Sequence, residues 1–317
     1  MTQKRFTTFA WITVAYTVFV ILWGAFVRAT GSGAGCGSHW PSCNGQVIPR
    51  PEQIETIIEF AHRITSALNG LLVIGLVFGA FRLFPKGHLA RRGAVLSLIF
   101  IIIEGLLGAA LVRFEWVVDN VSVSRVVASG VHLINTSILV TVIALTAWWG
   151  GGGGRLRLKG QGSAAWLIGI AYVGYLVLSA SGAITALGDT VFPSETLRAG
   201  LAADLDPTAH FLVRLRVWHP VIAIALGLYL VMMSTAVSTQ RPSPSADRHA
   251  RYLKIIFGVQ LLAGFVNVLL LAPVWMQIVH LLLANLVLLV LILFSADILS
   301  HPHPAAESRA LAPQVGD

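Results

Sequence analysis

Long apolar stretches constrain this chain more than any other feature of its sequence. A helix needs about 18 or more apolar residues to cross a bilayer core, and eight stretches approach or exceed this length. The stretches are continuous rather than alternating, which favours helices over barrel strands. The sequence therefore predicts an all-α membrane protein with eight transmembrane helices. They are expected roughly at residues 9–27, 57–84, 94–112, 126–149, 164–187, 211–237, 255–272 and 276–299.

The distribution of charge predicts how these helices are oriented. The net charge of +8 could indicate nucleic-acid binding, but only 11% of the residues are charged and their placement follows the predicted spans. Most of the 22 lysines and arginines fall on one side of the spans, and the acidic residues favour the other. The positive-inside rule then places both termini in the cytoplasm, with the first apolar stretch a retained helix rather than a signal peptide. We expect a multi-pass protein of a bacterial-type plasma membrane, surrounded by lipid and without a nucleic-acid partner.

The two halves of the chain resemble each other. Gly24-Ala-Phe in the first stretch matches Gly182-Ala-Ile in the fifth, and Glu104-Gly-Leu-Leu-Gly-Ala in the third matches Gln260-Leu-Leu-Ala-Gly-Phe in the seventh. An even number of helices per copy keeps both copies in one orientation, so we expect two pseudo-symmetric four-helix bundles. A glycine-rich basic segment between them predicts a flexible linker. The expected parts are an N-terminal half (1–150), a linker (151–160), a C-terminal half (161–300) and a cytoplasmic tail (301–317).

Four histidines recur at matched places in the two halves. His62, His132, His219 and His280 each lie in the outer part of an even-numbered helix, which puts the four rings at a similar depth. Two facing helices of one bundle can each offer an imidazole to a metal between them, and imidazole on both faces suits low-spin haem iron. A lone intramembrane histidine is more often structural, and zinc or copper stays open as an alternative. We interpret the four as iron ligands of two haems, near the outer side.

The first half carries carboxylates beside its histidines, and the second half does not. Glu59 stands three residues before His62, on the same helical face, whereas Arg216 stands three residues before His219. Glu104 of the first half is matched by a glutamine in the second. Chemistry that needs an acid is therefore expected in the first half. A capping role for Glu59 and a purely structural role for Glu104 are the simpler alternatives.

Three arginines lie close to the histidines in sequence. Arg63 directly follows His62, and Arg214 and Arg216 precede His219. Haem propionates bind cations at a membrane surface, so these three are candidates for that role. Arginines at this depth also extend to the interface without binding any ligand, and the sequence supports both interpretations equally.

The chain has two cysteines, Cys36 and Cys43, in a glycine-rich outer loop. An exposed pair outside the cytoplasm favours a disulfide, worth roughly 2.5 kcal/mol in the chain-entropy model for a loop of this size. A metal site that includes His39 lacks a fourth ligand. The motif for covalent haem attachment, C-x-x-C-H, is absent from the sequence. A redox-active pair that passes electrons to the neighbouring site is a further alternative.

Together these features resemble the haem A synthase family over about residues 9–299. The resemblance rests on two four-helix halves, the cysteine pair, the Glu-x-x-His-Arg motif that begins at Glu59, and single histidines in the other even-numbered helices. It implies oxidation of the C8 methyl group of haem O to a formyl group. It also implies a haem b cofactor on His219 and His280, and a substrate haem O on His62 and His132. Glu59 would be the essential acid near the reacting methyl.

The resemblance further implies partners. Haem O would come from the farnesylating enzyme that makes it, haem O synthase, and oxidation would need an unidentified electron donor or acceptor. Two alternative functions stay open from the residues alone. A di-haem b-type electron carrier, for example linked to quinone, would use the same four histidines without Glu59. A transporter would use the parallel repeats and keep the histidines as proton relays.

Overall fold

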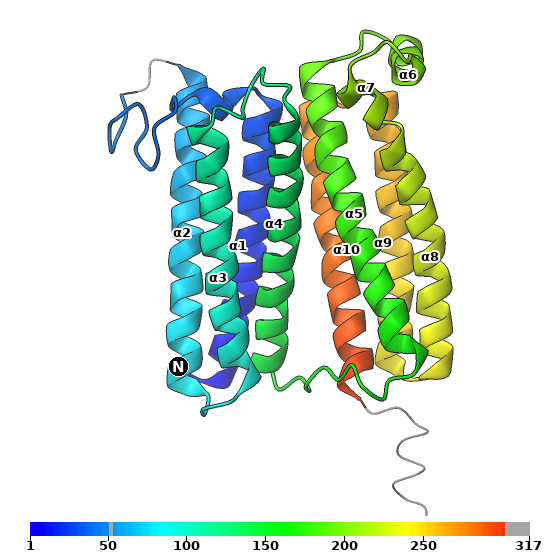
Figure 1. Cartoon of the computed structure of the whole chain (residues 1–317). Coiled ribbons are helices and arrows are strands. Elements are labelled where there is room, and N and C mark those ends of the chain that lie inside the picture. The colour runs from blue at the N-terminus through cyan, green and yellow to red at the C-terminus, as the bar shows by residue number, and fades with distance from the viewer. Residues whose placement is uncertain (51–52, 302–317) are drawn as a thin grey trace, which may run out of the picture.

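Eight long helices run side by side through the molecule (Figure 1). The computed structural model describes residues 1–50 and 53–301, and over these residues it contains no β-strand beyond an isolated bridge between Cys43 and Gln46. The predicted fold class, an all-α protein with eight transmembrane helices, is confirmed. The helices are α1 (Gln3–Ala29), α2 (Ile54–Leu83), α3 (Leu89–Arg113), α4 (Val123–Gly150), α5 (Ser163–Val191), α7 (Phe211–Leu215) with α8 (Trp218–Gln240), α9 (Pro244–Leu269) and α10 (Val274–Ser300).

The helices extend beyond their predicted ends wherever a cap lies outside the apolar stretch. The helix predicted from residue 255 begins at Pro244, because the Ser243 side chain accepts the N–H of Ala246 and proline fits the first turn. A short helix, α6 (Leu197–Leu205), was not predicted at all. Its first turn is capped in the same way, by the side chain of Thr196. Apolar length does not reveal such ends, because caps are polar and local.

Each half forms a four-helix bundle, and the two bundles stand next to each other (Figure 1). In the first, α1 and α3 each pack against both α2 and α4, which leaves α2 and α4 diagonally opposite. In the second, α5 and α9 each pack against both α8 and α10, so α8 and α10 are the diagonal pair. The helices that carry the four histidines are therefore the diagonal helices of both bundles.

The bundles meet through α1 and α4 of the first and α5 and α10 of the second. The expected pseudo-two-fold relation maps α1 onto α5 and α4 onto α10. It therefore maps the contact between α4 and α5 onto the contact between α10 and α1. Arg28, at the end of α1, crosses this interface and donates hydrogen bonds to the carbonyl of Ala186 (2.6 Å), to Oγ1 of Thr190 (2.6 Å) and to Oε1 of Gln277 (2.8 Å).

The outer surface of the helix assembly is apolar. Large side chains such as Leu71, Phe78 and Leu262 are 62%, 69% and 63% exposed in the chain by itself. Hydrocarbon is the environment in which such faces are stable. The protein is a multi-pass membrane protein. The connection between the bundles runs from Gly151 to Gly162, and the predicted tail beyond residue 301 lies outside the described residues.

Candidate functional site

The second bundle brings two imidazole rings together between α8 and α10. The ring centres of His219 and His280 are 6.3 Å apart, and the ring planes are nearly perpendicular at 84°. His219 Nδ1 lies 3.0 Å from Oγ of Ser181 on α5, and His280 Nε2 lies 3.3 Å from Nε2 of Gln260 on α9. Nδ1 of His280 is buried and has no hydrogen-bond partner. The pair therefore keeps one buried ring nitrogen, Nδ1 of His280, without a protein partner.

This geometry fits an iron ion held between the two rings. An ion about 2 Å from one nitrogen of each ring holds the two ring centres roughly 6 Å apart, close to the separation of His219 and His280. The bond from Ser181 to the other nitrogen of His219 is the kind of outer contact that fixes a ligand ring. Within residues 1–50 and 53–301, no group of three or more His, Cys, Asp or Glu side chains is placed to hold a metal ion. His219 and His280 would be sufficient protein ligands for a haem iron, because the macrocycle would supply the other nitrogens.

The first bundle places its two histidines in the corresponding positions on α2 and α4. Nδ1 of His62 and Nδ1 of His132 are both buried without a hydrogen-bond partner. Nδ1 of His132 lies 3.6 Å from Oε1 of Glu104 on α3. The first pair thus has a carboxylate within reach, where the second pair has the amide of Gln260.

Glu104 is held by polar groups of α4. Its Oε2 accepts a hydrogen bond of 2.6 Å from Nδ2 of Asn135, and its Oε1 accepts one from the hydroxyl of Thr136. A carboxylate bonded in this way is suited to orienting His132, because its oxygens already have fixed partners. This arrangement agrees with the simpler, structural alternative for Glu104.

Glycines let the helices approach the histidine rings, and this role was not predicted. A Cβ atom built on Gly24 of α1 would lie 3.0 Å from Cε1 of His62, and one on Gly182 of α5 would lie 3.0 Å from Cε1 of His219. Gly264 of α9 has the same relation to His280, at 2.9 Å. The matching Gly-Ala pairs in the two sequence repeats were the signal that could have revealed it.

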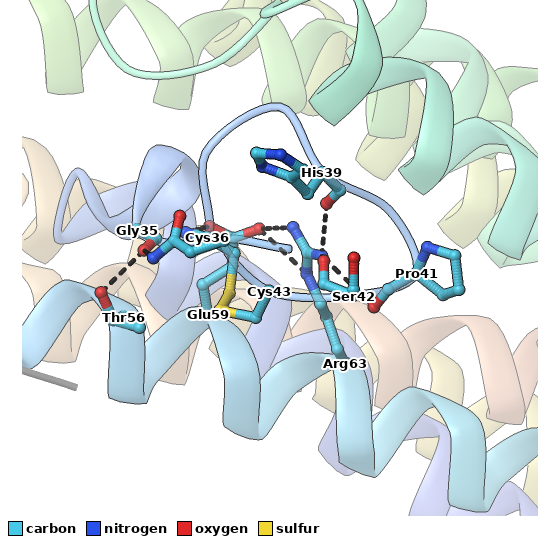
Figure 2. The surroundings of a disulfide bond; sticks show 10 residues. Gly35, Cys36, His39, Pro41, Ser42, Cys43, Thr56, Glu59 and Arg63 are labelled. Atoms are coloured by element: carbon cyan, nitrogen blue, oxygen red, sulfur yellow. Dashed lines mark hydrogen bonds and ion pairs between the residues drawn. A yellow bond between two sulfur atoms is a disulfide. The ribbon is translucent and has the colours of Figure 1, made fainter. Parts of the chain in front are cut away.

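The loop before α2 is closed by the predicted disulfide, Cys36–Cys43 (Figure 2). The prediction is confirmed, and both cysteines are fully buried. The loop is attached to α2 through Thr56, whose hydroxyl donates to the carbonyl of Gly35 at 2.7 Å, and through Glu59, whose Oε2 accepts the backbone N–H of Cys36 at 2.8 Å. The disulfide loop (Cys36–Cys43) is therefore bonded to the helix that carries His62.

Arg63 joins Glu59 to the far side of the same loop. Its Nε donates to Oε1 of Glu59 at 3.1 Å, and its Nη2 contacts the same oxygen. Its Nη1 donates to the carbonyls of His39 (2.7 Å) and Ser42 (2.6 Å), as Figure 2 shows. Glu59 is only 3% exposed, so the ion pair holds a buried carboxylate.

The other two arginines singled out in the sequence differ in their surroundings. Arg216 is buried and pairs with Oδ1 of Asp204 on α6 (2.8 Å) and Oδ1 of Asp189 on α5 (3.2 Å). Arg214 is exposed on the short helix α7. Sequence reasoning did not find the partners of Arg216, because Asp204 lies on the short helix that apolar length could not reveal.

Comparison with known proteins agrees with this architecture. A family model described as cytochrome oxidase assembly protein (COX15-CtaA) matches residues 7–292. Two relatives, from two strains of Thermus thermophilus, are each 52% identical over 296 residues and are named protoheme IX farnesyltransferase. The match covers 93% of this chain but 49% of each relative, so the chain spans about half their length.

Other relatives match a shorter part of this chain and are named heme A synthase. A heme A synthase of Alkalihalophilus pseudofirmus is 44% identical over 112 residues, which are 35% of this chain and 38% of that protein. A heme A synthase of Halalkalibacterium halodurans is 46% identical over 112 residues, with the same shares. Because the family model covers most of its length, this chain belongs to the COX15-CtaA family of cytochrome oxidase assembly proteins, the haem A synthase family.

Proposed function

We propose that this protein is a haem A synthase that oxidises the C8 methyl group of haem O to a formyl group within the membrane. The observation that carries the proposal is the asymmetry between two otherwise matched histidine pairs. A buried carboxylate, Glu59, lies one helical turn from His62, while the equivalent residue before His219 is the paired cation Arg216. An enzyme with one haem to modify and one haem to keep needs such a difference.

The second half is the cofactor half in this proposal, with haem b held by His219 and His280. Their ring separation and the contact from Ser181 support stable ligation of a resident haem, which would supply electron transfer when bound. Glu59 and Glu104 have no counterparts there. A site without free acids is suited to holding a haem without modifying it.

The first half is then the substrate half, with haem O between His62 and His132. Conversion of a methyl to a formyl group removes electrons and protons and adds oxygen, so a proton acceptor near the methyl carbon is required. The carboxylate of Glu59 is suited to accept such a proton, or to attack a cationic carbon derived from the methyl. Arg63, Arg214 and Arg216 stay proposals as propionate partners. Arg63 and Arg216 would have to exchange their present protein partners for a propionate.

The names of the relatives suggest the partner. The matched residues of this chain belong to the family above, so we assign the farnesyltransferase name to the half of the Thermus relatives that lies outside the match. Farnesylation of protohaem yields haem O, the proposed substrate. We therefore propose that this protein receives haem O from a haem O synthase and exchanges electrons with a further redox partner. Both termini would lie in the cytoplasm and both haem sites toward the outer side.

A di-haem b-type electron carrier is the second candidate. It is favoured by one observation, that both oxygens of Glu59 are already bonded within the protein, as in a structural ion pair. In that case the first pair, His62 and His132, would hold a second haem b rather than haem O.

Haem extraction and mass analysis test the proposal. The protein is expressed with and without a haem O source and then purified. The haems extracted from it are identified by mass. Haem A or its hydroxylated precursor, formed only with haem O present, is the expected result. Haem b alone under both conditions would support the electron carrier, and protein without haem would support a transporter instead.

A further inference from the structure

Glu59, Arg63 and the disulfide loop form one closed chain of bonds (Figure 2). The N–H of Cys36 donates to one carboxylate oxygen of Glu59, and Arg63 donates to the other. The same guanidinium donates to the carbonyl of Ser42, the neighbour of Cys43, and the disulfide returns to Cys36. One of these bonds lies within α2, one lies within the loop, and the other two join the loop to α2. The position of the carboxylate therefore depends on the loop.

The charge of Glu59 depends on the same contacts. A carboxylate that is only 3% exposed is costly to keep ionised unless donors face it. Arg63 supplies the positive charge and the backbone of Cys36 a further donor, and both favour the charged form. Without Arg63, the buried carboxylate would lose the positive charge that faces it.

The second bundle has no such arrangement. Pro220 follows His219 where Arg63 follows His62, so the second repeat cannot form the same pair. Arg216, one turn before His219, is bound instead to Asp189 and Asp204. The bonds that join Glu59, Arg63 and the disulfide loop, here called the clamp, therefore belong to the half that would hold the substrate.

We propose that Arg63 is a positioning residue, which holds the Glu59 carboxylate charged and in place against the disulfide loop. This inference rests on the proposed function, because it assigns the oxidation of haem O to a carboxylate of fixed position and charge. For Arg63, this role replaces the propionate contact considered above. The disulfide closes the loop to which Glu59 and Arg63 are bonded, and so anchors the clamp.

The test compares Arg63→Gln, Arg63→Lys and the control Arg113→Gln. Arg113 is exposed at the end of α3. In membranes supplied with haem O, Arg63→Gln is expected to lower kcat for haem A formation at least tenfold and to move the acid limb of the pH profile upward. Arg63→Lys should recover part of the rate and return the acid limb of the pH profile toward its wild-type position. Lysine keeps the positive charge but lacks the forked geometry of the guanidinium. Haem b per protein should stay within twofold in all variants, which shows that they fold.

Two kinetic outcomes would overturn the proposal. A pure rise in KM for haem O with an unchanged acid limb would identify Arg63 as a propionate anchor. A wild-type rate and pH profile in Arg63→Gln would remove any role for it.

An infrared measurement judges the clamp without activity. Arg63→Gln is expected to show a protonated carboxyl band near neutral pH that disappears in Arg63→Gln/Glu59→Gln. Absence of this band overturns the clamp, whatever the activity. If the wild-type protein forms no haem A, the proposed function fails, and the infrared result still decides the state of Glu59.

Discussion

Gly182 of α5 lies directly against the imidazole of His219, so that a Cβ atom at this glycine would come within 3.0 Å of Cε1. Gly24 of α1 has the same relation to His62. The two glycines occupy matching positions in the two repeats. A histidine ring can approach the neighbouring helix this closely only where that helix has no side chain.

Valine at Gly182 should displace His219 and weaken the hold on haem b. Overpacking of this kind costs about 1–3 kcal/mol, which corresponds to a roughly 5- to 150-fold loss in affinity. Haem b per protein, measured from the pyridine haemochrome spectrum, should fall in Gly182→Val and stay normal in Gly24→Val. Gly169→Val is the control on the same helix, since the space around that glycine is open. Equal haem b in all three variants would contradict the assignment of His219.

His280→Ala should abolish haem b binding, because one of the two proposed iron ligands is lost. His132→Ala should leave haem b in place and prevent haem A formation, since His132 belongs to the other bundle. Optical spectra of the purified variants, recorded with and without haem O, distinguish the two. If His132→Ala removes the resident haem and His280→Ala does not, the roles of the two bundles are reversed.

Replacement of Glu59 by glutamine should stop haem A formation while haem b binding persists. Loss of a general base or nucleophile at this point is expected to lower the rate by a factor of about 100 or more. Glu55→Gln, one turn earlier on α2, is the matched control and should keep its activity. Quantification of haem A by chromatography decides the matter, and an unchanged yield in Glu59→Gln would remove this residue from the mechanism.

Serine at both Cys36 and Cys43 should loosen the disulfide loop. The chain-entropy model assigns roughly 2.5 kcal/mol to this closure, so the amides of residues 36–43 should exchange hydrogen faster. Haem A formation should fall, because the bonds from the loop to Glu59 and Arg63 weaken, whereas haem b should be unaffected. Hydrogen-exchange mass spectrometry checks the first point. Unchanged exchange in the loop would show that the disulfide does not order it.

Methionine at Arg28 should weaken the contact between the two bundles. It removes the hydrogen bonds that this charged donor makes to the carbonyl of Ala186, to Oγ1 of Thr190 and to Oε1 of Gln277, a loss of about 2–3 kcal/mol. Thermal unfolding in detergent should show a lower midpoint for Arg28→Met. Arg113→Met alters an exposed arginine and should differ little from the unmutated protein. A matching midpoint in both variants would argue against Arg28 as a link.

Local features of the sequence were enough for the spans, the halves and the disulfide. Apolar length predicts a membrane helix because a bilayer core has a fixed thickness, and this property needs no tertiary information. The disulfide between Cys36 and Cys43 followed from the chain having two cysteines in one outer loop. The histidines of the two halves could be matched because both copies of the repeat have the same orientation.

Contacts between distant segments required the tertiary structure. Glu59 and Arg63 are one turn apart on α2, but whether they also bond to the disulfide loop depends on where that loop packs. Whether Arg216 pairs with Asp189 and Asp204 depends likewise on the position of a short helix. Short polar segments such as α6 have no apolar signature, and a cap is decided by one or two side chains. The close approach of Gly182 to His219 also depends on how α5 and α8 pack. The sequence by itself determined the spans and the residue types at the candidate sites, because hydropathy is local. Only the tertiary structure decided which charges meet, because a buried charge is stabilised by partners that are remote along the chain.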